Sequence, residues 1–413
     1  MRLTMFKNRS SVDSRIDYSL ILPVFFLLLI GIVAVYIAVS QDYPDLVAQI
    51  VGQQLMWVVV GIISAFLVMF FSTEFLWKAT PFLYVFGLGL MVLPLFFYSP
   101  ELVASTGAKN WVTIGGMTLF QPSEFMKISY ILMMARVIVT FHKRYPKREL
   151  RHDFLLIGLL GLCTLPVLVL LGLQSDLGTS LVFVAIFGGM VLLSGVSWKI
   201  LLPTVTVGLA LVSGFMLLFV SPGGTAFLHD LGMDTYQINR ISAWLDPFKN
   251  AQSTTYQQAQ SLIAIGSGGL TGLGFNKTNL LVPVRESDMI FTVIGEDFGF
   301  VGGCLLIGLY TLMIYRMLRI TLKSNNRFYT YISTGYIMMV LFHVFENIGA
   351  ATGVLPLTGI PLPFISQGGS SMVANLIGVG LVLSMSYQYT LSKEKRNTQS
   401  RSYKKISIKR VER

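Results

Sequence analysis

The sequence predicts an all-α polytopic integral membrane protein with about ten transmembrane helices. Of the 413 residues, 54% are hydrophobic and 12% are charged, and the mean hydropathy is +0.68. A soluble domain of this length could not bury so much apolar surface. Nearly uninterrupted apolar stretches of roughly 20 residues, the length of a membrane-crossing helix, also recur along the chain. They are expected to be helical, because backbone polar groups in lipid must be satisfied within the segment.

These stretches give the predicted spans in order. The first follows a charged segment containing Asp17 and is too long for the apolar region of a signal peptide, so we expect it to remain in the mature protein. We interpret residues 20–390 as one membrane domain, between an N-terminal segment 1–19 and a basic tail 391–413. The predicted spans are residues 20–40, 50–71, 78–98, 121–141, 153–173, 177–195, 198–220, 289–315, 328–351 and 367–389.

Basic residues predict how the spans are oriented. They gather before the first span, after the fourth, after the eighth and in the tail, within residues 2–15, 142–148, 316–327 and 393–413. Counting the spans alternately places all of these segments on one side, and short cytoplasmic loops are the ones enriched in Lys and Arg. We therefore expect a multi-pass protein of the plasma membrane with both termini in the cytoplasm. The net charge of +11 follows from this topology and favours anionic lipid, so no nucleic-acid partner is expected.

In this topology the outer side carries two long connections, residues 99–121 and 221–288. The second is far longer than most loops of a compact protein, and such loops are usually functional or disordered. Helical spacing over Tyr236–Trp244 predicts a partly helical extracellular element on the membrane surface. The cytoplasmic loops are short, so any chemistry is expected at the outer face, which excludes direct use of cytoplasmic ATP or nucleotide sugars. Gly266–Gly274 agrees with this, because it matches neither a P-loop nor a dinucleotide fingerprint.

Asp288 is the first candidate for chemistry. Arg285, Glu286 and Ser287 precede it, and an apolar run begins at Met289. An acid at the boundary between water and lipid is expected to pair with another group, to orient a helix or to handle protons.

Glu124 and Lys127 form a second candidate at the start of the fourth predicted span. Pro122 is suited to a helix start, and Glu124 falls in the first turn. Residues three apart share a helix face, so the two side chains can pair. The pair is either a structural ion pair between helices or the polar wall of an outward-facing cavity, in which Lys127 attracts an anionic head group.

Several residues of the outer loops have both a structural and a functional interpretation. Trp111 is either an interfacial anchor or, with the adjoining Lys109, part of a substrate site. Arg240 could clamp a phosphate with its planar guanidinium. Asp176, near the start of a predicted helix, is most simply a cap.

Other polar residues lie within or between the last spans. Glu296 and Asp297 fall about two turns into the eighth span, and His343 and Glu346 share a face of the ninth. They form either an internal polar network or a proton or ion relay. The connection Gly353–Ser371 is rich in Pro and Gly, and such irregular backbone at membrane depth occurs only where it lines a cavity or is buried in protein. The alternative is a plain loop.

No thiol or tight metal site is indicated. Cys163 and Cys304 both lie within predicted spans. The spacings of His, Cys and carboxylate residues do not match those of a tight metal site.

Together these strings resemble the shape, elongation, division and sporulation family of bacterial cell-wall proteins, whose best known members are RodA and FtsW. The similarity covers nearly the whole membrane region. The strings that carry it are Lys109–Trp111, Gln121–Lys127, Gln174–Thr179, Gln260–Gly274, Arg285–Phe291 and Gly353–Ser370. Leu245–Pro247 and Pro361–Ser366 are closer to the RodA branch. Ser175 departs from the proline that is more usual in the family, which leaves the role of Asp176 unaffected.

The resemblance implies a peptidoglycan glycosyltransferase that polymerises lipid II into β-1,4 glycan at the outer face of the plasma membrane. It implies several partners: lipid II, the growing glycan strand, an activating class B penicillin-binding protein and other membrane proteins of the elongation complex. The essential loop aspartate of the family falls on Asp288. Its characteristic Glu and Lys fall on Glu124 and Lys127, and its loop Trp falls on Trp111.

An α-linked donor that gives a β-linked product requires inversion, and therefore one carboxylate base without a covalent intermediate. We expect Asp288 to be that base. The leaving pyrophosphate needs cations, for which Lys109, Lys127 and Arg240 are the candidates. The sequence fixes no cofactor, and a divalent cation, Mg²⁺ or Mn²⁺, is an open expectation. The residues expected to bind substrate are Lys109, Trp111, Glu124, Lys127, Arg240, Ser366 and Gly368.

Two other functions fit parts of the pattern. Charged residues buried in spans would suit a lipid II flippase, although transport should place its critical charges near the middle of the bilayer, whereas the motifs here are mostly outer-facing. A non-catalytic scaffold of the wall-synthesis complex would leave Asp288 as a helix cap.

Overall fold

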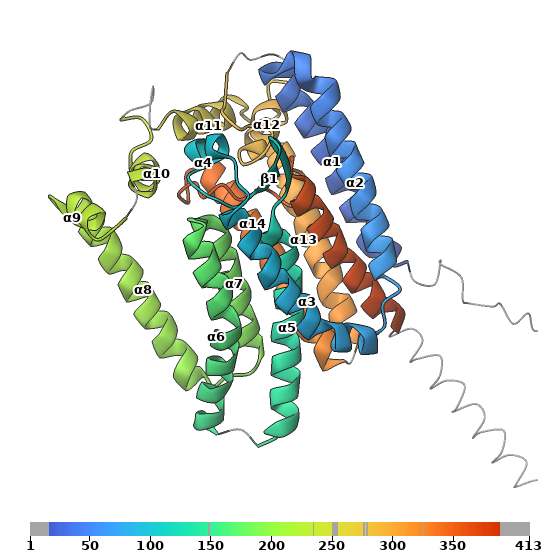
Figure 1. Ribbon diagram of the computed structural model, residues 1–413. Coiled ribbons are helices and arrows are strands. Elements are labelled where there is room, and N and C mark those ends of the chain that lie inside the picture. Colours follow the sequence, from blue (N-terminus) through green and yellow to red (C-terminus); the bar gives the residue numbers. More distant parts are fainter. Residues whose placement is uncertain are drawn as a thin grey trace, which may run out of the picture.

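The computed structural model describes residues 16–388 except residues 148, 234, 250–254, 276, 278–279 and 325. Helices dominate it, and most of them run along one axis of the bundle (Figure 1). Short helices, a hairpin and irregular segments gather at one end, which we call the loop-rich end. The predicted tail 391–413 and residues 1–15 of the predicted N-terminal segment lie outside the described residues.

The long apolar helices confirm a multi-pass membrane protein. Among the described residues, nine helices are long and apolar enough to cross a membrane, and the shorter α7 (Leu177–Leu193) brings the set into line with the predicted spans. The nine are α1 (Tyr18–Asp42), η2 with α2 (Pro44–Val68), α3 with η3 (Thr73–Leu95), α5 (Pro122–Arg144), α6 (Leu150–Leu173), α8 (Trp198–Val220), α13 (Gly299–Ser324), α14 (Arg327–Ala351) and a C-terminal helix, Gly369–Gln388.

Capping side chains fix where several of these helices begin. The carboxylate of Asp17 accepts a hydrogen bond from the backbone N–H of Ser19 at the start of α1, and the hydroxyl of Ser72 accepts one from Phe75 in α3. Such caps satisfy N–H groups that have no partner within the helix. In α5, Pro122 occupies the first turn, where its missing N–H costs nothing.

The centre of the bundle is built around α5 and α14. α14 packs against α5, α7 and α13, and α5 also packs against α3. By contrast α8 is mostly exposed, lies at the edge of the bundle and packs chiefly against the short helix α9 (Gly224–Asp230) (Figure 1). Glu124 and Lys127 of α5 therefore face protein, where they need partners.

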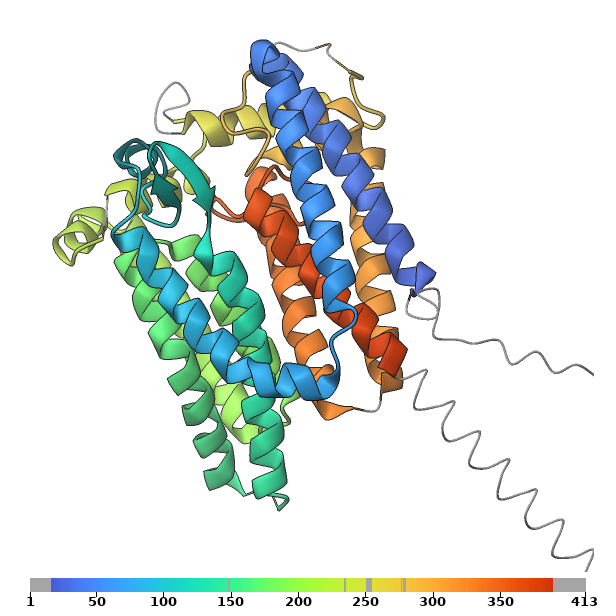
Figure 2. The same ribbon diagram turned by 45° about the vertical axis from the view of Figure 1, so that its right-hand side comes forward.

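Two connections supply most of the loop-rich end. Between α3 and α5 the chain forms α4 (Pro100–Thr106) and an antiparallel hairpin of β1 (Val112–Ile114) and β2 (Met117–Phe120), which Figure 2 shows beside the upper end of the bundle. The hairpin was not predicted from the sequence. The connection after α8 contains α9, α10 (Thr235–Leu245) and α11 (Tyr256–Ser267).

The predicted eighth span, residues 289–315, is wrong as a single helix. The structure has α12 (Ile290–Asp297), a break at Phe298, and then α13. At the break the backbone oxygen of Glu296 accepts a hydrogen bond from the N–H of Leu273 at 2.9 Å, and Asp297 accepts one from Gly274 at 3.1 Å. These carbonyls bond to the loop that follows α11, which ends the helix. Glu296 and Asp297 therefore lie about two turns from the start of α12, as predicted, but at the end of this short helix and not inside a continuous span.

Candidate functional site

Asp288 sits directly before α12, with its backbone held on both sides. Its backbone oxygen accepts a hydrogen bond from Nδ2 of Asn347 at 2.7 Å. The backbone oxygen of the preceding Ser287 accepts a bond from the hydroxyl of Ser366 at 2.7 Å. The sequence thus places an acid at the end of a loop, and contacts from α14 and from the last connection fix its position.

Opposing effects set the pKa of the Asp288 carboxyl group. Burial raises its pKa, whereas a hydrogen bond from the hydroxyl of Ser287 to Oδ1 (3.1 Å) and the positive charge of Arg240 lower it. The net result is a pKa above the ordinary value of an aspartate. A general base works best when its pKa approaches the operating pH, so the environment suits proton abstraction.

Arg240 brings a positive charge from the long connection to this acid. It belongs to α10, and its Nη1 donates a hydrogen bond to the backbone oxygen of Leu357 at 3.0 Å. A Cβ atom placed on Gly359 would lie 3.2 Å from Oδ2 of Asp288 and 3.6 Å from Nη2 of Arg240. The acid and the guanidinium therefore flank the same short turn. The predicted catalytic residue and one predicted phosphate ligand are brought together.

Glu346 is a second acid in this region. It is buried in α14, and its Oε1 accepts hydrogen bonds from the backbone N–H of Thr358 (3.2 Å) and from the Thr358 hydroxyl. The sequence placed Glu346 on a face with His343, but it gave no indication that the partner would be a threonine in the following loop.

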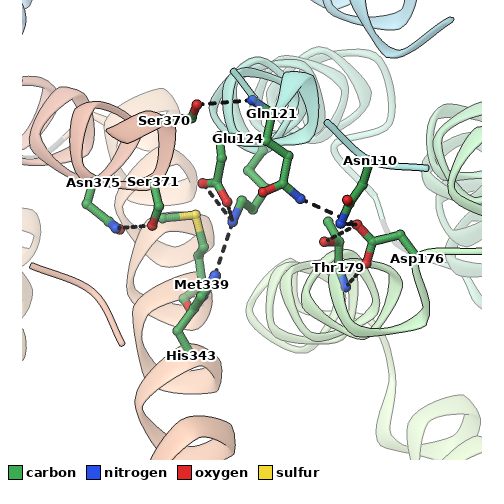
Figure 3. Close-up of polar contacts among 11 residues, drawn as sticks. Asn110, Gln121, Glu124, Asp176, Thr179, Met339, His343, Ser370, Ser371 and Asn375 are labelled. Atoms are coloured by element: carbon green, nitrogen blue, oxygen red, sulfur yellow. Dashed lines mark hydrogen bonds and ion pairs between the residues drawn. The ribbon is translucent and has the colours of Figure 1, made fainter. Parts of the chain in front are cut away.

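Glu124 and Lys127 form the predicted ion pair in the interior of the bundle. Nζ of Lys127 lies 2.9 Å from Oε2 of Glu124, and the side chains are 2% and 6% exposed. Nζ also lies 3.1 Å from Nε2 of His343 in α14 (Figure 3). With two partners and so little exposure, Lys127 is engaged within the protein, which supports the structural interpretation of the pair. Its predicted contact with a head group stays a prediction.

Asp176 is confirmed as a cap, and it does more than cap. Its Oδ1 accepts from the backbone N–H of Thr179 at 3.0 Å at the start of α7. Its Oδ2 accepts from Nδ2 of Asn110 at 2.8 Å and from Nε2 of Gln121 at 3.4 Å (Figure 3). One carboxylate thus joins α7 to the residues before the hairpin and to the residue before α5.

One face of α14 contacts both the Lys127 ion pair and the Asp288 region. Glu346 and Asn347 follow His343 by three and four residues, the spacing that places side chains together on a helix. His343 contacts Lys127, Glu346 holds Thr358, and Asn347 holds Asp288. The sequence analysis missed Asn347, although its i+4 spacing from His343 was the available signal.

The other predicted substrate residues lie around the loop-rich end. Nζ of Lys109 lies over the ring of Tyr98, 4.8 Å from its centroid, and Trp111 directly precedes β1. Ser366 is buried, and its hydroxyl also accepts a bond from the N–H of Leu362 at 2.8 Å. Gly368 precedes the C-terminal helix. Substrate binding by these residues stays a prediction.

A buried arginine anchors the loop that carries Asp288 to two helices. Arg285 is fully buried, pairs with Glu296 of α12, and donates from Nη1 to Oε1 of Gln41 at 2.6 Å. It therefore links the loop that carries Asp288 to α1 and α12. The sequence analysis did not identify this pair, because it placed Glu296 inside a span.

The described residues contain no group of three or more His, Cys, Asp or Glu side chains able to hold a metal ion. The divalent cation expected from the sequence, Mg²⁺ or Mn²⁺, stays a prediction.

Comparisons with known proteins agree with this architecture. The family model for the cell cycle proteins FtsW, RodA and SpoVE matches residues 18–391. Stage V sporulation protein E of Bacillus subtilis is 32% identical over 379 residues, which cover 90% of this chain and 96% of that protein. The peptidoglycan glycosyltransferase MrdB of Escherichia coli K12 is 33% identical over 375 residues, which cover 90% and 93%. A chain of a solved peptidoglycan synthase complex, which coordinates polymerization and crosslinking, superposes with a TM-score of 0.71 at 28% identity, covering 90% of this chain and 98% of that one.

Proposed function

The chain belongs to the FtsW, RodA and SpoVE family of cell cycle proteins, and we propose that it is a peptidoglycan glycosyltransferase that polymerises lipid II with Asp288 as general base. The observation that carries the role of Asp288 is its geometry. The acid is fixed through its backbone by Asn347, it has a raised pKa, and it flanks the same turn as Arg240. A fixed base beside a cation is what a single displacement with an anionic leaving group needs.

In the proposed reaction, Asp288 takes the proton from the 4-hydroxyl of the acceptor GlcNAc. The oxygen attacks the anomeric carbon of the donor sugar, and the bond from that carbon to the lipid pyrophosphate breaks with its electron pair leaving on the phosphate oxygen. Attack from the opposite side inverts the α-linkage to β. Of the three predicted cations, Arg240 is the one whose charge lowers the pKa of Asp288, and its planar guanidinium suits a phosphate oxygen.

The orientation of the protein in the membrane follows from this proposal. We place the loop-rich end, with Asp288, at the outer face of the plasma membrane, and both termini in the cytoplasm. The basic residues within 142–148 and 316–327 support this, because those of the described part lie at the end of α5, at the end of α13 and at the start of α14. These helix ends are opposite the loop-rich end (Figure 1). Leu245–Pro247 and Pro361–Ser366 resemble the RodA branch more closely than the FtsW branch, which supports a role in elongation and cell shape.

We also propose that the protein works with a class B penicillin-binding protein, which would crosslink the strands that this chain polymerises. The similarity to a chain from a complex that couples polymerization and crosslinking supports this partnership. Lipid II and the growing glycan strand would bind at the loop-rich end. Other membrane proteins of the elongation complex complete the proposed set of partners.

The test uses the full chain, purified with its penicillin-binding partner and given lipid II in detergent. We expect the wild type to produce glycan polymer and Asp288→Asn to produce none, because the amide cannot accept the proton. Asp246→Asn is the matched control, since Asp246 is an exposed aspartate of the same long connection and should polymerise normally. Polymer from Asp288→Asn at the wild-type rate would overturn the base assignment. Translocation of lipid II in liposomes without any polymer would favour the flippase.

A further inference from the structure

Glu346 is a buried acid for which the proposed reaction has no use. It is 2% exposed, and its Oε1 accepts both hydrogen bonds from Thr358. Its Oε2 is buried and has no hydrogen-bond partner in the described part of the chain. Burying a carboxylate in a membrane protein is costly, so an acid in such a place usually has a function.

The residue after Thr358 lies beside the proposed base. Gly359 has φ +79°, in the left-handed region, and a Cβ placed there would lie 3.2 Å from Oδ2 of Asp288. The Asp288 carboxylate therefore lies beside the turn that Glu346 holds. Any shift of Thr358 would be passed to that carboxylate through one peptide unit.

The ends of the same turn are also tied to the site. Nη1 of Arg240 donates to the oxygen of Leu357 at 3.0 Å. Nδ2 of Asn347 donates to the oxygen of Ile360 at 2.9 Å and to that of Asp288 at 2.7 Å. Asn347 thus fixes the backbone of the base, while its neighbour Glu346 fixes the turn against which the carboxylate lies.

We propose that Glu346 is a positioning residue that acts on Asp288 by holding the Thr358–Gly359 turn against its carboxylate. The inference rests on the proposed role of Asp288 as base.

The experiment compares Glu346→Leu with Glu346→Gln in the polymerisation assay. Leucine cannot hold Thr358, so we expect kcat to fall by about tenfold to a hundredfold with KM nearly unchanged, the result of misplacing a catalytic group. Glutamine retains an oxygen that accepts from Thr358, so it should keep most of the activity. Recovery of kcat with glutamine but not with leucine would show that the acceptor oxygen positions the turn, which loss of packing alone would not produce.

Two further variants keep the test decisive if Glu346→Leu does not fold. Thr358→Val removes only the hydroxyl that bonds to Glu346 and should lower kcat several-fold. Thr352→Val is the matched control, because the Thr352 hydroxyl donates to Ile348 of its own helix at 2.8 Å and should not affect kcat.

The proposal fails if Thr358→Val keeps the wild-type kcat, or if Glu346→Gln loses as much of kcat as Glu346→Leu. If only the role of Glu346 is wrong, the wild type still polymerises lipid II and Asp288→Asn does not. If the proposed function itself is wrong, Asp288→Asn remains active.

Discussion

Lys127 and His343 meet in the interior of the bundle, where Nζ of the lysine lies 3.1 Å from Nε2 of the histidine. Nδ1 of His343 lies 2.7 Å from the backbone oxygen of Met339, which can only accept, so Nδ1 carries a hydrogen. The ammonium of Lys127 can only donate, so Nε2 must offer its lone pair. His343 is therefore the neutral tautomer with hydrogen on Nδ1. Glu124, Lys127 and His343 together are electrically balanced.

This balance predicts a large loss of stability when the lysine alone is removed. Lys127→Met leaves the carboxylate of Glu124 buried without its cation, and breaking one side of a buried pair costs about 3–5 kcal/mol. The free energy of unfolding in detergent should fall by that amount. The double variant Lys127→Met with Glu124→Leu should recover much of it, because both charges are then gone.

Lys78→Met is the matched control for that measurement. Lys78 also pairs with a glutamate, Glu74, at 2.7 Å, but both side chains are exposed, at 73% and 77%. Exposed pairs contribute little, so no loss of stability is expected. Equal effects of the two lysine substitutions would contradict the buried, balanced cluster.

The hydrogen bond from Ser287 predicts a shift in the pH dependence of activity. The Ser287 hydroxyl stabilises the ionised form of Asp288 and so lowers its pKa, against the rise caused by burial. Ser287→Ala removes that effect, so the pKa of Asp288 should rise further. Activity, which needs the ionised base, would then be lost at a higher pH as the pH falls. The acidic limb of kcat/KM measures this shift.

Ser267→Ala is the control for the loss of a hydroxyl in the same connection. The Ser267 hydroxyl donates to Ala264 within α11 at 2.7 Å, away from Asp288. Its pH profile should match the wild type. A limb that moves to lower pH in Ser287→Ala would show that this hydrogen bond does not act on the base.

We expect Gly359→Ala to lower activity by more than the strain in its backbone alone would. An alanine there would need the left-handed conformation at φ +79° and would also bring Cβ to 3.2 Å from Oδ2 of Asp288. The strain costs about 1–2 kcal/mol of stability. The contact displaces the base, so kcat should fall by about a hundredfold.

Gly223→Ala separates these two effects. Gly223 has φ +78°, and none of the described residues has an atom within 4 Å of a Cβ placed there. It should lower stability to a similar extent and leave kcat unchanged. A normal kcat in Gly359→Ala would mean that the turn does not constrain Asp288.

Much of the site could be predicted, because its residues stand out locally. Asp288 was evident as an acid where a polar loop meets an apolar run, and the pairing of Glu124 with Lys127 follows from helix spacing. The partners of these residues could not be predicted. Lys127 and His343 are 216 residues apart in the sequence, and Asp288 and Asn347 are 59 apart. Nothing local to either residue specifies such a contact.

The amino-acid sequence was enough to predict the membrane class, the number of long apolar helices and the candidate base, because the length of an apolar run and helical periodicity are local properties. The break at Phe298 in the run after Asp288 depends on tertiary contacts, since the carbonyls that end α12 bond to a loop from α11. Tertiary contacts also explain how α14 holds Asp288 through Asn347, and how it holds the turn beside Asp288 through Glu346. These contacts depend on how helices distant in the chain pack together, and packing determines which buried polar groups can find partners.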